Sequence, residues 1–566
     1  MIAVRRLALA IAPRGDLVTR RTVALAAASV AAGTGAILAA VGLMATSGYL
    51  ISRAALRPPI PDLMVLFVAV RFFGVVRPTL RYLERLASHE LTFRLLAVIR
   101  SRFLGALLPL SYGDLAAFRA GDLLSRLAAD VDTLQEAWLR VVAPAGIAVI
   151  VTAVVVKALA FVDPWIALVV LGLLAFHGAF WSWMAQRQAR ATGAVRNEQR
   201  RAQSADLVSL MQGLEDVLAF GQEEAERARF AERQRGADAV ELRDGRQLAV
   251  HAAMGTAMTA FAAWCVLVSA LGDVASGELS PVWVAALVLA TIAAFESVES
   301  LPGAWQAAGR TRDSAQRVAD VVETAPAVVD AADAVALPAG PAPAIRFERV
   351  TFGYASAPVV RDASFEIRSG EHVAVIGPTG VGKSTILTLI ERGWDPTSGR
   401  ITIDGLDLRR VRLRDLRAGL AVLPQQVHVF NETLRENVRL ARPSASDADV
   451  VEVLTRARLG DFLRGLPAGL DTVLGEHGSR MSAGERQRLG FARLLLTNAR
   501  LVLADEPTAN LDARHERELL GALREWACGR TMVVVSHSRA AQSYVDRVLA
   551  MGDGMLTPHP SRPRGG

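Results

Sequence analysis

Long apolar runs dominate the first half of the chain, and shorter β-branched runs replace them in the second half. Six apolar stretches lie at about 22–47, 62–83, 138–161, 164–184, 248–272 and 281–300. Each stretch approaches the roughly 20 residues that an α-helix needs to cross a bilayer. The pattern therefore predicts an α-helical domain with six membrane spans over residues 22–325.

The chain before the first span follows a different pattern. The apolar run within residues 1–21 is too short to cross a bilayer, and arginines lie on both sides of it. We interpret this segment as an interfacial lead-in helix on the cytoplasmic side, and a cleaved signal peptide fits it less well.

From Ile345 to about Leu556, short β-branched runs alternate with segments of helical periodicity. This alternation is typical of an α/β domain, which we place at residues 345–556. Residues 326–344 combine four prolines with alanine, aspartate and glycine. We expect a linker there that contributes nothing to a core, and a disordered tail over residues 557–566.

Composition and charge add a membrane topology. The chain has 566 residues and 52% hydrophobic content, which is typical of a membrane protein with more than one domain. Arginine gathers at the N-terminus and in about 85–137 and 185–247, whereas the connections 162–164 and 273–280 carry none and 48–61 carries two. Because basic residues collect on the cytoplasmic side, we expect the N-terminus, both long loops and the α/β domain there. The net charge of +7 then reflects topology, and we expect no binding to nucleic acid.

One of only two lysines, Lys383, lies in the sequence GPTGVGKST, from Gly377 to Thr385. Hydrophobic residues on both sides predict a strand, a glycine loop and a helix, which is the context of a phosphate-binding loop. The loop's N–H groups can surround phosphates, the lysine adds a compact charge, and Ser384 is expected to hold Mg²⁺. The predicted ATP contacts of the loop are Gly377, Thr379, Gly380, Gly382, Lys383, Ser384 and Thr385.

Further residues in the α/β domain complete a site for ATP hydrolysis. Tyr354 can stack on adenine, and Gln425 can reach Mg²⁺ and the attacking water. The buried run LVLADE ends in Asp505, expected to hold Mg²⁺ through water, and Glu506, expected to polarise the attacking water. His537 follows another hydrophobic run and can contact the γ-phosphate. Taken singly, a tyrosine or histidine beside a strand is more often a packing residue, but their fixed order favours the functional interpretation.

The segment MSAGERQR, from Met481 to Arg488, resembles the signature motif of ATP-binding cassette (ABC) exporters, and Ala509–Asp512 resembles their D-loop. The resemblance covers nearly the whole chain. It implies two cassettes that close head to tail, so that each ATP lies between one phosphate loop and the partner's signature. Ser482 and Gly484 of the signature and Asp512 of the D-loop would then contribute to nucleotide sites.

Two departures from the signature suggest an asymmetric pair. Ala483 replaces the usual first glycine, and Glu485 replaces the usual glutamine. A carboxylate near phosphates is unfavourable, so the site that uses this signature is expected to be the weaker one. The chain's own phosphate loop and acids are complete, which favours a heterodimer with a partner whose signature is intact.

Two segments that we expect in the cytoplasm resemble the intracellular loops of exporters. They are Gly121–Leu134 and Leu210–Glu224. The resemblance implies that each loop carries a short coupling helix, which passes cassette closure to the membrane spans. The alternative is an ordinary amphipathic helix that packs on a neighbour.

A row of basic residues lies in and beyond the second span. At about 100° per residue, this row occupies about 120° of one helical face; it comprises Arg71, Arg77, Arg81, Arg85 and His89. Charges at membrane depth usually face a cavity or a partner, so the row could attract a carboxylate-bearing solute. Alternatively, Glu84 neutralises Arg81 three residues away, or the end of the row is solvated in the cytoplasm. Pro78 could also kink the helix and blur the face.

The stretches RFFGVVRPTLRYLERLASHE, MATSGYLISRAAL and AFE resemble the CydC subunits of CydDC transporters. This resemblance implies a CydD-like partner, a place in the bacterial cytoplasmic membrane and a role in cytochrome bd assembly. It further implies traffic in cysteine, glutathione or haem, with His89 as a candidate axial ligand of haem b. The alternative for His89 is a polar cap or a packing residue.

These patterns leave more than one function open. The first is an ATP-driven transporter that moves a small thiol or haem across the membrane. The second is a non-transporting membrane ATPase that senses haem or redox state. The third is a homodimeric multidrug or lipid exporter.

Overall fold

The computed structural model describes residues 19–559, apart from 117, 119, 182, 185–186, 188–206, 208, 212, 339, 355–356 and 510–511. The chain forms two compact units. The helical unit consists of Met1–Leu108 and Ala120–Thr324, and the α/β unit consists of Pro109–Arg119 and Ala325–Gly566. A short excursion from the helical half of the sequence therefore belongs to the α/β unit.

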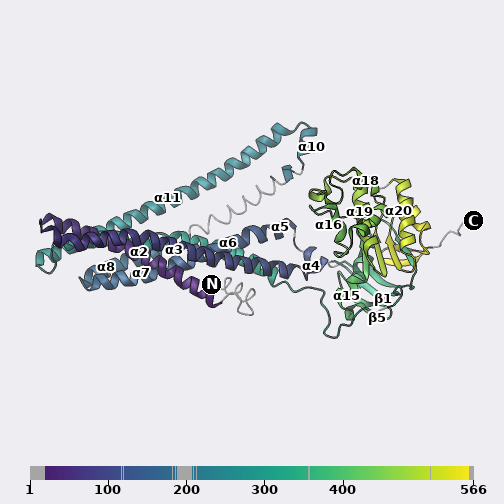
Figure 1. Ribbon diagram of the computed structural model, residues 1–566, viewed down its shortest axis with the longest axis horizontal. Coiled ribbons are helices and arrows are strands. Elements are labelled where there is room, and N and C mark those ends of the chain that lie inside the picture. The colour runs from purple at the N-terminus through teal and green to yellow at the C-terminus, as the bar shows by residue number, and fades with distance from the viewer. Residues whose placement is uncertain are drawn as a thin grey trace, which may run out of the picture. The chain divides into compact units, whose positions relative to one another are not determined.

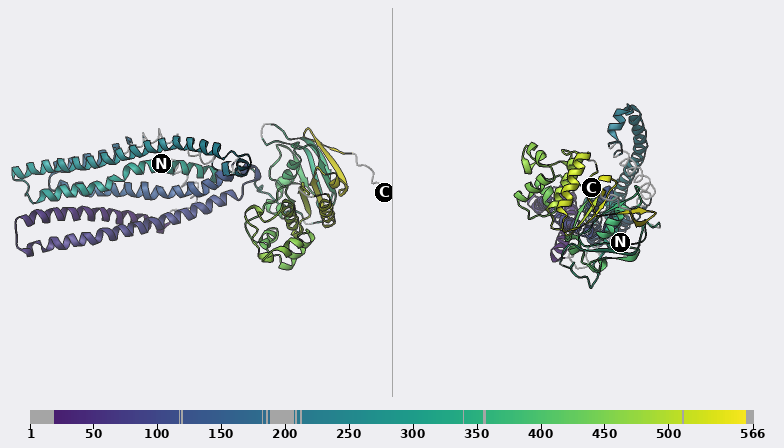
Figure 2. Two further views of the ribbon diagram at one scale, coloured as in Figure 1. Left: turned by 90° about the horizontal axis from the view of Figure 1, so that it is seen from above. Right: turned by 90° about the vertical axis from the view of Figure 1, so that its right-hand side faces the viewer.

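Long helices build the helical unit (Figure 1). The α-helices are α2 (Arg20–Ala55), α3 (Ile60–Leu107), α5 (Ala120–Ser125), α6 (Val131–Glu136), α7 (Ala143–Ala160), α8 (Pro164–Ala175), α10 (Leu214–Ala219), α11 (Glu223–Ser276), α12 (Trp283–Glu299) and α13 (Leu301–Val322). The π-helical segments η1 (Arg126–Asp130), η2 (Ala137–Val142) and η3 (Phe176–Trp181) lie between some of them. Figure 2 shows α2 and α3 as a long antiparallel pair, and α2 also packs on α12.

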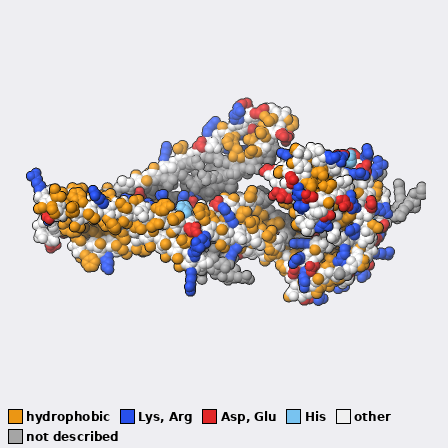
Figure 3. All heavy atoms as spheres, in the orientation of Figure 1, with side chains coloured by type: hydrophobic (Ala, Val, Ile, Leu, Met, Phe, Trp, Pro, Cys, Tyr) orange, Lys and Arg blue, Asp and Glu red, His pale blue; other side chains and the backbone are white. Residues whose placement is uncertain are grey.

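Among the described residues, five helical segments are long and apolar enough to cross a membrane: Arg20–Ala55, Ile60–Leu107, Asp122–Ala160, Ala252–Ser276 and Trp283–Val322. A further apolar helix, Pro164–Phe180, is shorter within the described residues. Each of the apolar stretches in the sequence falls on one of these helices. Figure 3 shows hydrophobic side chains over most of the visible face of the helical unit, as expected of a surface that meets lipid or other helices.

The start of α2 corrects one expectation. Thr19 accepts a hydrogen bond from the backbone N–H of Thr22 at 3.1 Å and forms a capping box with it. Arg20 and Arg21 therefore form the first turn of α2 and are not part of a separate lead-in helix. The rest of the expected lead-in helix, residues 1–18, lies outside the described residues.

Two sheets form the α/β unit. A four-stranded antiparallel sheet has the order β2 (Val360–Ile367), β1 (Ile345–Phe352), β4 (Ser398–Ile403), β5 (Leu406–Asp407). A six-stranded sheet has the order β10 (Met555–Pro558), β9 (Arg547–Gly552), β3 (His372–Ile376), β8 (Thr531–Val535), β7 (Leu501–Asp505), β6 (Leu420–Leu423). Strands β9, β3, β8, β7 and β6 are parallel, and only β10 pairs antiparallel.

The parallel strands of the six-stranded sheet are continuous apolar runs. Such runs are expected because parallel strands are buried on both faces. All five residues of β8, for example, are buried. The helices of the α/β unit are α14 (Lys383–Ile390), α15 (Leu413–Ala418), α16 (Leu434–Arg439), α17 (Asp447–Arg456), α18 (Gly460–Gly465), α19 (Ala483–Leu496), α20 (Ala513–Trp526) and α21 (Arg539–Ser543), with α4 (Tyr112–Ala116) from the early part of the chain. Of these, α14, α15 and α19 pack on strands of the six-stranded sheet. The carboxyl ends of the parallel strands thus meet at one edge, where such sheets bind ligands.

The segment 326–344 is attached to the α/β unit, so the expectation that it adds nothing to a core is wrong. Val328 and Ala342 are buried. Arginines from the folded unit hold its backbone, because Arg392 donates to the Val329 carbonyl at 2.9 Å and Arg500 donates to the Pro338 carbonyl at 2.7 Å. Composition alone could not reveal these contacts, since they use backbone carbonyls.

The predicted boundary of the disordered tail is also wrong. Thr557 and Pro558 belong to β10, where they pair with Ala550 and Leu549 of β9. Proline is tolerated there because β10 is an edge strand. The remaining tail, from residue 560, lies outside the described residues.

Candidate nucleotide-binding site and membrane charge cluster

The glycine loop lies between β3 and α14, at the carboxyl edge of the six-stranded sheet. Gly382 has φ +106, and a Cβ there would lie 2.4 Å from Val359 Cγ1. A Cβ on Gly377 would lie 2.4 Å from the Met551 carbonyl oxygen. Only glycine fits both positions, and the loop can therefore direct its backbone N–H groups at an anion.

Lys383 is the first residue of α14, and its Nζ folds back over the loop. It donates to the carbonyl oxygens of Gly377 at 3.0 Å and Pro378 at 2.8 Å. Burial lowers the pKa of Lys383, and the nearby carboxylates of Glu506 and Asp505 oppose that shift. Phosphate oxygens are stronger hydrogen-bond acceptors than carbonyl oxygens. The Lys383 ammonium can therefore exchange these two carbonyls for the phosphate oxygens of a nucleotide.

Asp505 ends β7 next to Ser384, which hydrogen bonds to its carboxylate. The other oxygen, Asp505 Oδ1, is buried and has no hydrogen-bond partner. Burial raises the pKa of Asp505, and the Ser384 hydrogen bond partly opposes the rise. An orphaned carboxylate oxygen beside a hydroxyl fits Mg²⁺, which prefers few protein ligands together with phosphate oxygens and water. Among the described residues, no three His, Cys, Asp or Glu side chains cluster as a cation site of their own.

Two predicted catalytic residues, Gln425 and His537, contact the third, Glu506. Gln425 Nε2 donates to Glu506 Oε2 at 3.1 Å, and His537 Nε2 lies 3.3 Å from Glu506 Oε1. The three side chains follow three different strands, β6, β7 and β8. Glu506 has φ +46, a strained value for a non-glycine residue. The surrounding structure therefore holds this carboxylate in one direction, beside the phosphate loop.

Tyr354, the predicted adenine contact, is half exposed and tied to the same loop. Its hydroxyl lies 3.1 Å from Thr385 Oγ1, and its ring meets Trp394 edge-on at a centroid distance of 5.7 Å. One face can therefore accept a planar base. Thr379 and Gly380 lie in the loop itself, where Gly380 has φ +81.

A charge cluster joins two helices of the helical unit. Arg77 Nη2, on α3, donates to Glu296 Oε1 at 3.2 Å and Oε2 at 3.0 Å, on α12. Arg81 Nη2 lies 3.8 Å from the same carboxylate. Glu84, expected to neutralise Arg81, instead accepts a hydrogen bond from Ser88 at 2.8 Å. That alternative is therefore wrong, because Glu84 faces the polar contact between α3 and α2.

His89 has an exposed side chain on α3, and its ring lies 6.0 Å from that of Phe93. No group of three His, Cys, Asp or Glu side chains surrounds it within the described part of the chain. A haem needs an enclosing apolar pocket as well as an axial nitrogen. The role of His89 as an axial ligand of haem b stays a prediction.

Known proteins resemble the chain in both units. The family model for the ABC transporter transmembrane region matches residues 22–296, and the ABC transporter model matches residues 360–509. The glutathione/L-cysteine transport system protein CydC of Escherichia coli is 33% identical over 530 residues, which cover 92% of this chain and 91% of the relative. The chain belongs to the ABC transporter family. The predicted fold class, a helical membrane domain followed by an α/β P-loop domain, is confirmed.

Other relatives also cover most of this ABC transporter. CydD of the glutathione/L-cysteine transport system of Bacillus subtilis is 32% identical, with 92% of this chain and 90% of the relative covered. An ATP-dependent lipid A-core flippase of Chromobacterium violaceum is 30% identical, with 87% and 84% covered. A bacterial Atm1-family ABC exporter with ATP bound has a TM-score of 0.83 at 25% identity, with 96% and 95% covered. The chain is therefore a membrane-integral ATP-binding and permease protein, and its ABC domain implies ATP binding.

The signature motif of this transporter begins helix α19. The Ser482 hydroxyl donates to Glu485 Oε2 at 2.8 Å, and so does the Ser482 backbone N–H at 2.8 Å. Gly484 lies in the first turn of α19. The replacement Glu485 thus forms a capping box and accepts both donors of Ser482.

Asp512, expected to contact nucleotide from the D-loop, caps helix α20. It accepts hydrogen bonds from the backbone N–H of Arg514 and of His515, each at 3.0 Å. The pKa of Asp512 is lowered to about 2, mainly because its carboxylate accepts hydrogen bonds from His515. The two preceding D-loop residues lie outside the described part of the chain.

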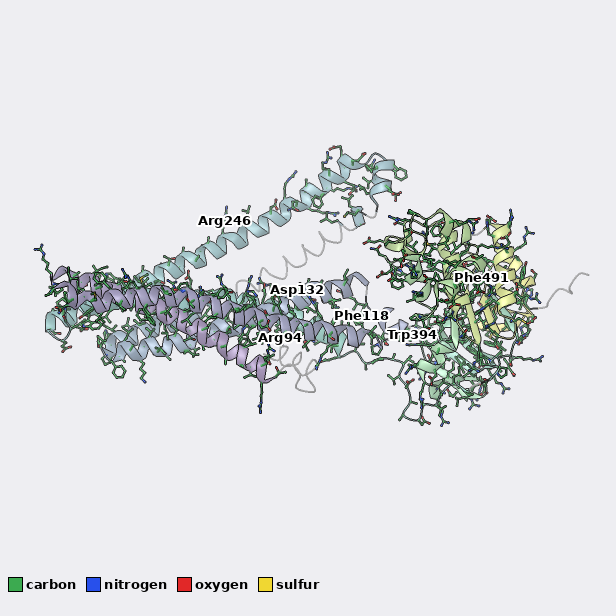
Figure 4. The ribbon with its side chains drawn as sticks, in the orientation of Figure 1. Arg94, Phe118, Asp132, Arg246, Trp394 and Phe491 are labelled. Atoms are coloured by element: carbon green, nitrogen blue, oxygen red, sulfur yellow. The ribbon has the colours of Figure 1, made fainter. Side chains whose placement is uncertain are left out.

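The sequence did not identify the segment of the helical half that docks on the cassette. That segment contains α4, and a Cβ on its Gly113 would lie 2.0 Å from the Trp394 ring. Figure 4 shows Trp394 beside this segment. The only local signal was the Ser111–Asp114 turn, in which the Ser111 N–H donates to Asp114 at 2.9 Å.

Both predicted coupling segments lie in the helical unit. Gly121–Leu134 spans α5, η1 and α6, where Asp130 accepts from Ser314 at 2.9 Å and pairs with Arg317, both on α13. Leu210–Glu224 carries the short helix α10, whose side chains are mostly exposed. The first segment therefore contacts α13 within the helical unit, and the coupling role of both segments stays a prediction.

Proposed function

We propose that this chain is one subunit of a heterodimeric ABC transporter that uses ATP to move cysteine or glutathione across the bacterial cytoplasmic membrane. The observation that carries the proposal is Glu506, held by Gln425 and His537 beside a complete phosphate loop, in a chain whose other half spans a membrane. The thiol class is supported by the two relatives described as glutathione/L-cysteine transport proteins.

ATP hydrolysis follows from the residues around the loop. Lys383 leaves the carbonyls of Gly377 and Pro378 to bind the β- and γ-phosphates. Glu506 accepts a hydrogen bond from the attacking water and aligns it with the γ-phosphorus, while His537 contacts the γ-phosphate. Ser384, Asp505 and Gln425 would hold Mg²⁺, which would supply positive charge to the phosphate oxygens. Tyr354 holds the adenine.

The partner is proposed to be a CydD-like subunit. ATP bound at this chain's phosphate loop would be closed by the partner's signature, and the partner's ATP would meet Ser482 and Gly484. Because Glu485 already occupies the donors of Ser482, the second site is the weaker one. One strong site and one weak site favour a heterodimer over a homodimer.

Arginine distribution supports the orientation. The N-terminus, the intracellular loops and the cassette face the cytoplasm, where ATP is available. Export of a reduced thiol would support the assembly of cytochrome bd in the same membrane. A homodimeric lipid or multidrug exporter remains the second candidate, because a lipid A-core flippase is 30% identical over 509 residues.

Reconstitution tests the proposal. The chain is purified with its native partner subunit, placed in proteoliposomes, and supplied with ATP and radiolabelled L-cysteine, reduced glutathione or haem. We expect movement of cysteine or glutathione, and loss of that movement in Glu506→Gln. Haem-stimulated ATP hydrolysis without movement of any solute would instead support a haem or redox sensor, and full activity of this chain without a partner would overturn the heterodimer.

A further inference from the structure

Two guanidinium groups share one carboxylate at the contact of α3 and α12. Arg77 donates to both oxygens of Glu296, and Arg81 lies 3.8 Å from Oε1 of the same carboxylate. The carboxylate nearest in sequence, Glu84, is engaged by Ser88, which in turn lies 2.9 Å from Ser29 of α2. The cluster therefore has two positive charges and one negative charge.

The cluster lies far along both apolar helices. Arg77 is 17 residues from the start of α3 at Ile60, or about 25 Å at 1.5 Å per residue. Glu296 is 13 residues from the start of α12 at Trp283, or about 20 Å. Charges at such depth are costly unless they are paired or face a hydrated cavity. An ion pair there is expected to have a functional role.

The three charged side chains of the cluster are paired with one another but remain partly exposed within this chain. The side chains of Arg77, Arg81 and Glu296 retain 40%, 50% and 28% exposure within this chain. Arg77 and Arg81 lie one helical turn apart, so both guanidinium groups can reach one small solute. A guanidinium binds a carboxylate through two parallel hydrogen bonds, and a carboxylate is a strong acceptor for an ammonium group.

We infer that Arg77, Arg81 and Glu296 form the binding site for the head group of a solute that carries both a carboxylate and an ammonium group. This inference rests on the proposed transport function and names the chemistry that its substrate site selects. The solute's carboxylate takes Arg77 and Arg81, and its ammonium takes Glu296. The ion pairs of both arginines with Glu296 are thus replaced by ion pairs with the solute. No charge is left unpaired within the membrane.

This exchange excludes related solutes. A solute with a carboxylate alone leaves Glu296 unpaired, and one with an ammonium alone leaves both arginines unpaired. Cysteine and glutathione have both groups, whereas a haem has carboxylates only. The α-amino acid head group is thus the feature recognised, and the thiol side chain extends beyond it.

Four thiol probes test the inference, and two of them each lack one charged group of L-cysteine. The complex with its native partner, in proteoliposomes, transports radiolabelled L-cysteine in competition with reduced glutathione, N-acetyl-L-cysteine or cysteamine. N-acetyl-L-cysteine lacks the ammonium and cysteamine lacks the carboxylate. We expect glutathione to compete, and the other two to compete at least about tenfold more weakly, as expected for the loss of a charged hydrogen bond.

Variants of the cluster test whether it causes the preference for cysteine over N-acetyl-L-cysteine. In Glu296→Gln, we expect the discrimination between cysteine and N-acetyl-L-cysteine to fall to about threefold or less, and in Arg77→Gln we expect cysteine transport to fall at least about tenfold. Arg94→Gln is the matched control on the same helix, because Arg94 pairs with Glu90 four residues away. Co-purification of the partner checks assembly.

The outcomes separate the two proposals. If the wild-type complex transports cysteine but N-acetyl-L-cysteine competes equally, the head-group site is overturned and the transport function stands. An unchanged selectivity in Glu296→Gln has the same consequence. If the wild-type complex moves neither thiol, both proposals fail. Should a variant not assemble, the four probes on the wild-type complex still decide.

Discussion

Gly113 of α4 lies against the ring of Trp394, so close that a Cβ on Gly113 would lie 2.0 Å from ring atom Cζ2. The same ring meets Tyr354, whose hydroxyl contacts Thr385 at the phosphate loop. Trp394 thus contacts both the proposed adenine site and the segment that returns to the membrane domain. We expect closure of the cassette around ATP to act on α4 through this ring.

Replacing Gly113 by valine should uncouple ATP hydrolysis from transport. The added side chain cannot fit beside Trp394, so α4 must move away from the cassette. We expect ATP binding to persist while thiol movement per ATP hydrolysed falls at least about tenfold, a loss of about 1.4 kcal/mol in coupling. The measurement is the ratio of solute moved to phosphate released in proteoliposomes.

Two variants control this prediction. Gly105→Val on α3 has open space around the added side chain and should leave the ratio unchanged. Gly113→Val combined with Trp394→Ala removes the clash and should recover part of the coupling. Normal coupling in Gly113→Val would contradict the proposed path.

Removal of the Lys383 ammonium should weaken ATP binding. Lys383→Ala deletes the charge that we expect at the β- and γ-phosphates, and hydrogen bonds to charged groups contribute about 1.5–3 kcal/mol. The expected loss in affinity is therefore about 10- to 100-fold, measured by titration with a fluorescent ATP analogue. Lys157→Ala, at the exposed other lysine on α7, is the control and should bind normally. Equal affinities would remove the basis of the nucleotide site.

The parts predicted well from sequence were local in the chain. The glycine loop, the two acids at the end of β7, Gln425 and His537 each lie at or just after a short apolar run that indicates a strand. Side chains that follow parallel strands meet at one edge, so their convergence could be expected. Their assigned roles remain predictions.

The features that the sequence did not predict depend on contacts between residues far apart in the chain. Glu296 pairs with Arg77 across 219 positions, and Arg500 holds the backbone of the 326–344 segment through Pro338, 162 positions away. Helix α4 has five residues, too few to show a helical period, and its partner Trp394 lies in another domain of the sequence. No local pattern marks such pairs.

Glu391 gives the cassette a pH-dependent stability. It follows α14, and burial, with a contribution from the charge of Asp505, raises its pKa to about 7, while Arg417 opposes the shift. An unfolded glutamate ionises near 4.3, so between about pH 4.5 and 7 the folded state holds a proton that the unfolded state has lost. The favourable contribution is full below that window and is lost as the pH rises through about 7.

Glu391→Gln should remove this dependence. At pH 8 the variant avoids an ionised buried carboxylate and should be more stable than the wild type, by up to about 3 kcal/mol. At about pH 4.5, the lower end of the window, the two proteins should be similar in stability. The measurement is thermal unfolding of the purified nucleotide-free transporter at both pH values, with Glu525→Gln at an exposed position of α20 as the control. A difference that is equal at both pH values would contradict the assignment.

Glu485 should determine the strength of the weaker ATP site. Its carboxylate accepts the Ser482 hydroxyl and N–H at the start of α19, where a phosphate would need the same donors. Glu485→Gln keeps an acceptor for the capping box but removes the negative charge. We expect ATP affinity at the partner's phosphate loop to rise about three- to tenfold, with a loss of helix stability of about 0.3–1 kcal/mol.

The measurement must separate the two sites of the complex. A Lys383→Ala background disables the phosphate loop of this chain, so the remaining ATP trapped by the complex reports the site that uses Ser482 and Glu485. Ser482→Ala in that background should lower trapping, because it removes the hydroxyl donor that Glu485→Gln would make available to the phosphate. Trapping that is unchanged by Glu485→Gln would mean that the carboxylate lies away from the phosphate in the closed complex, and the asymmetry would then require another cause, such as Ala483.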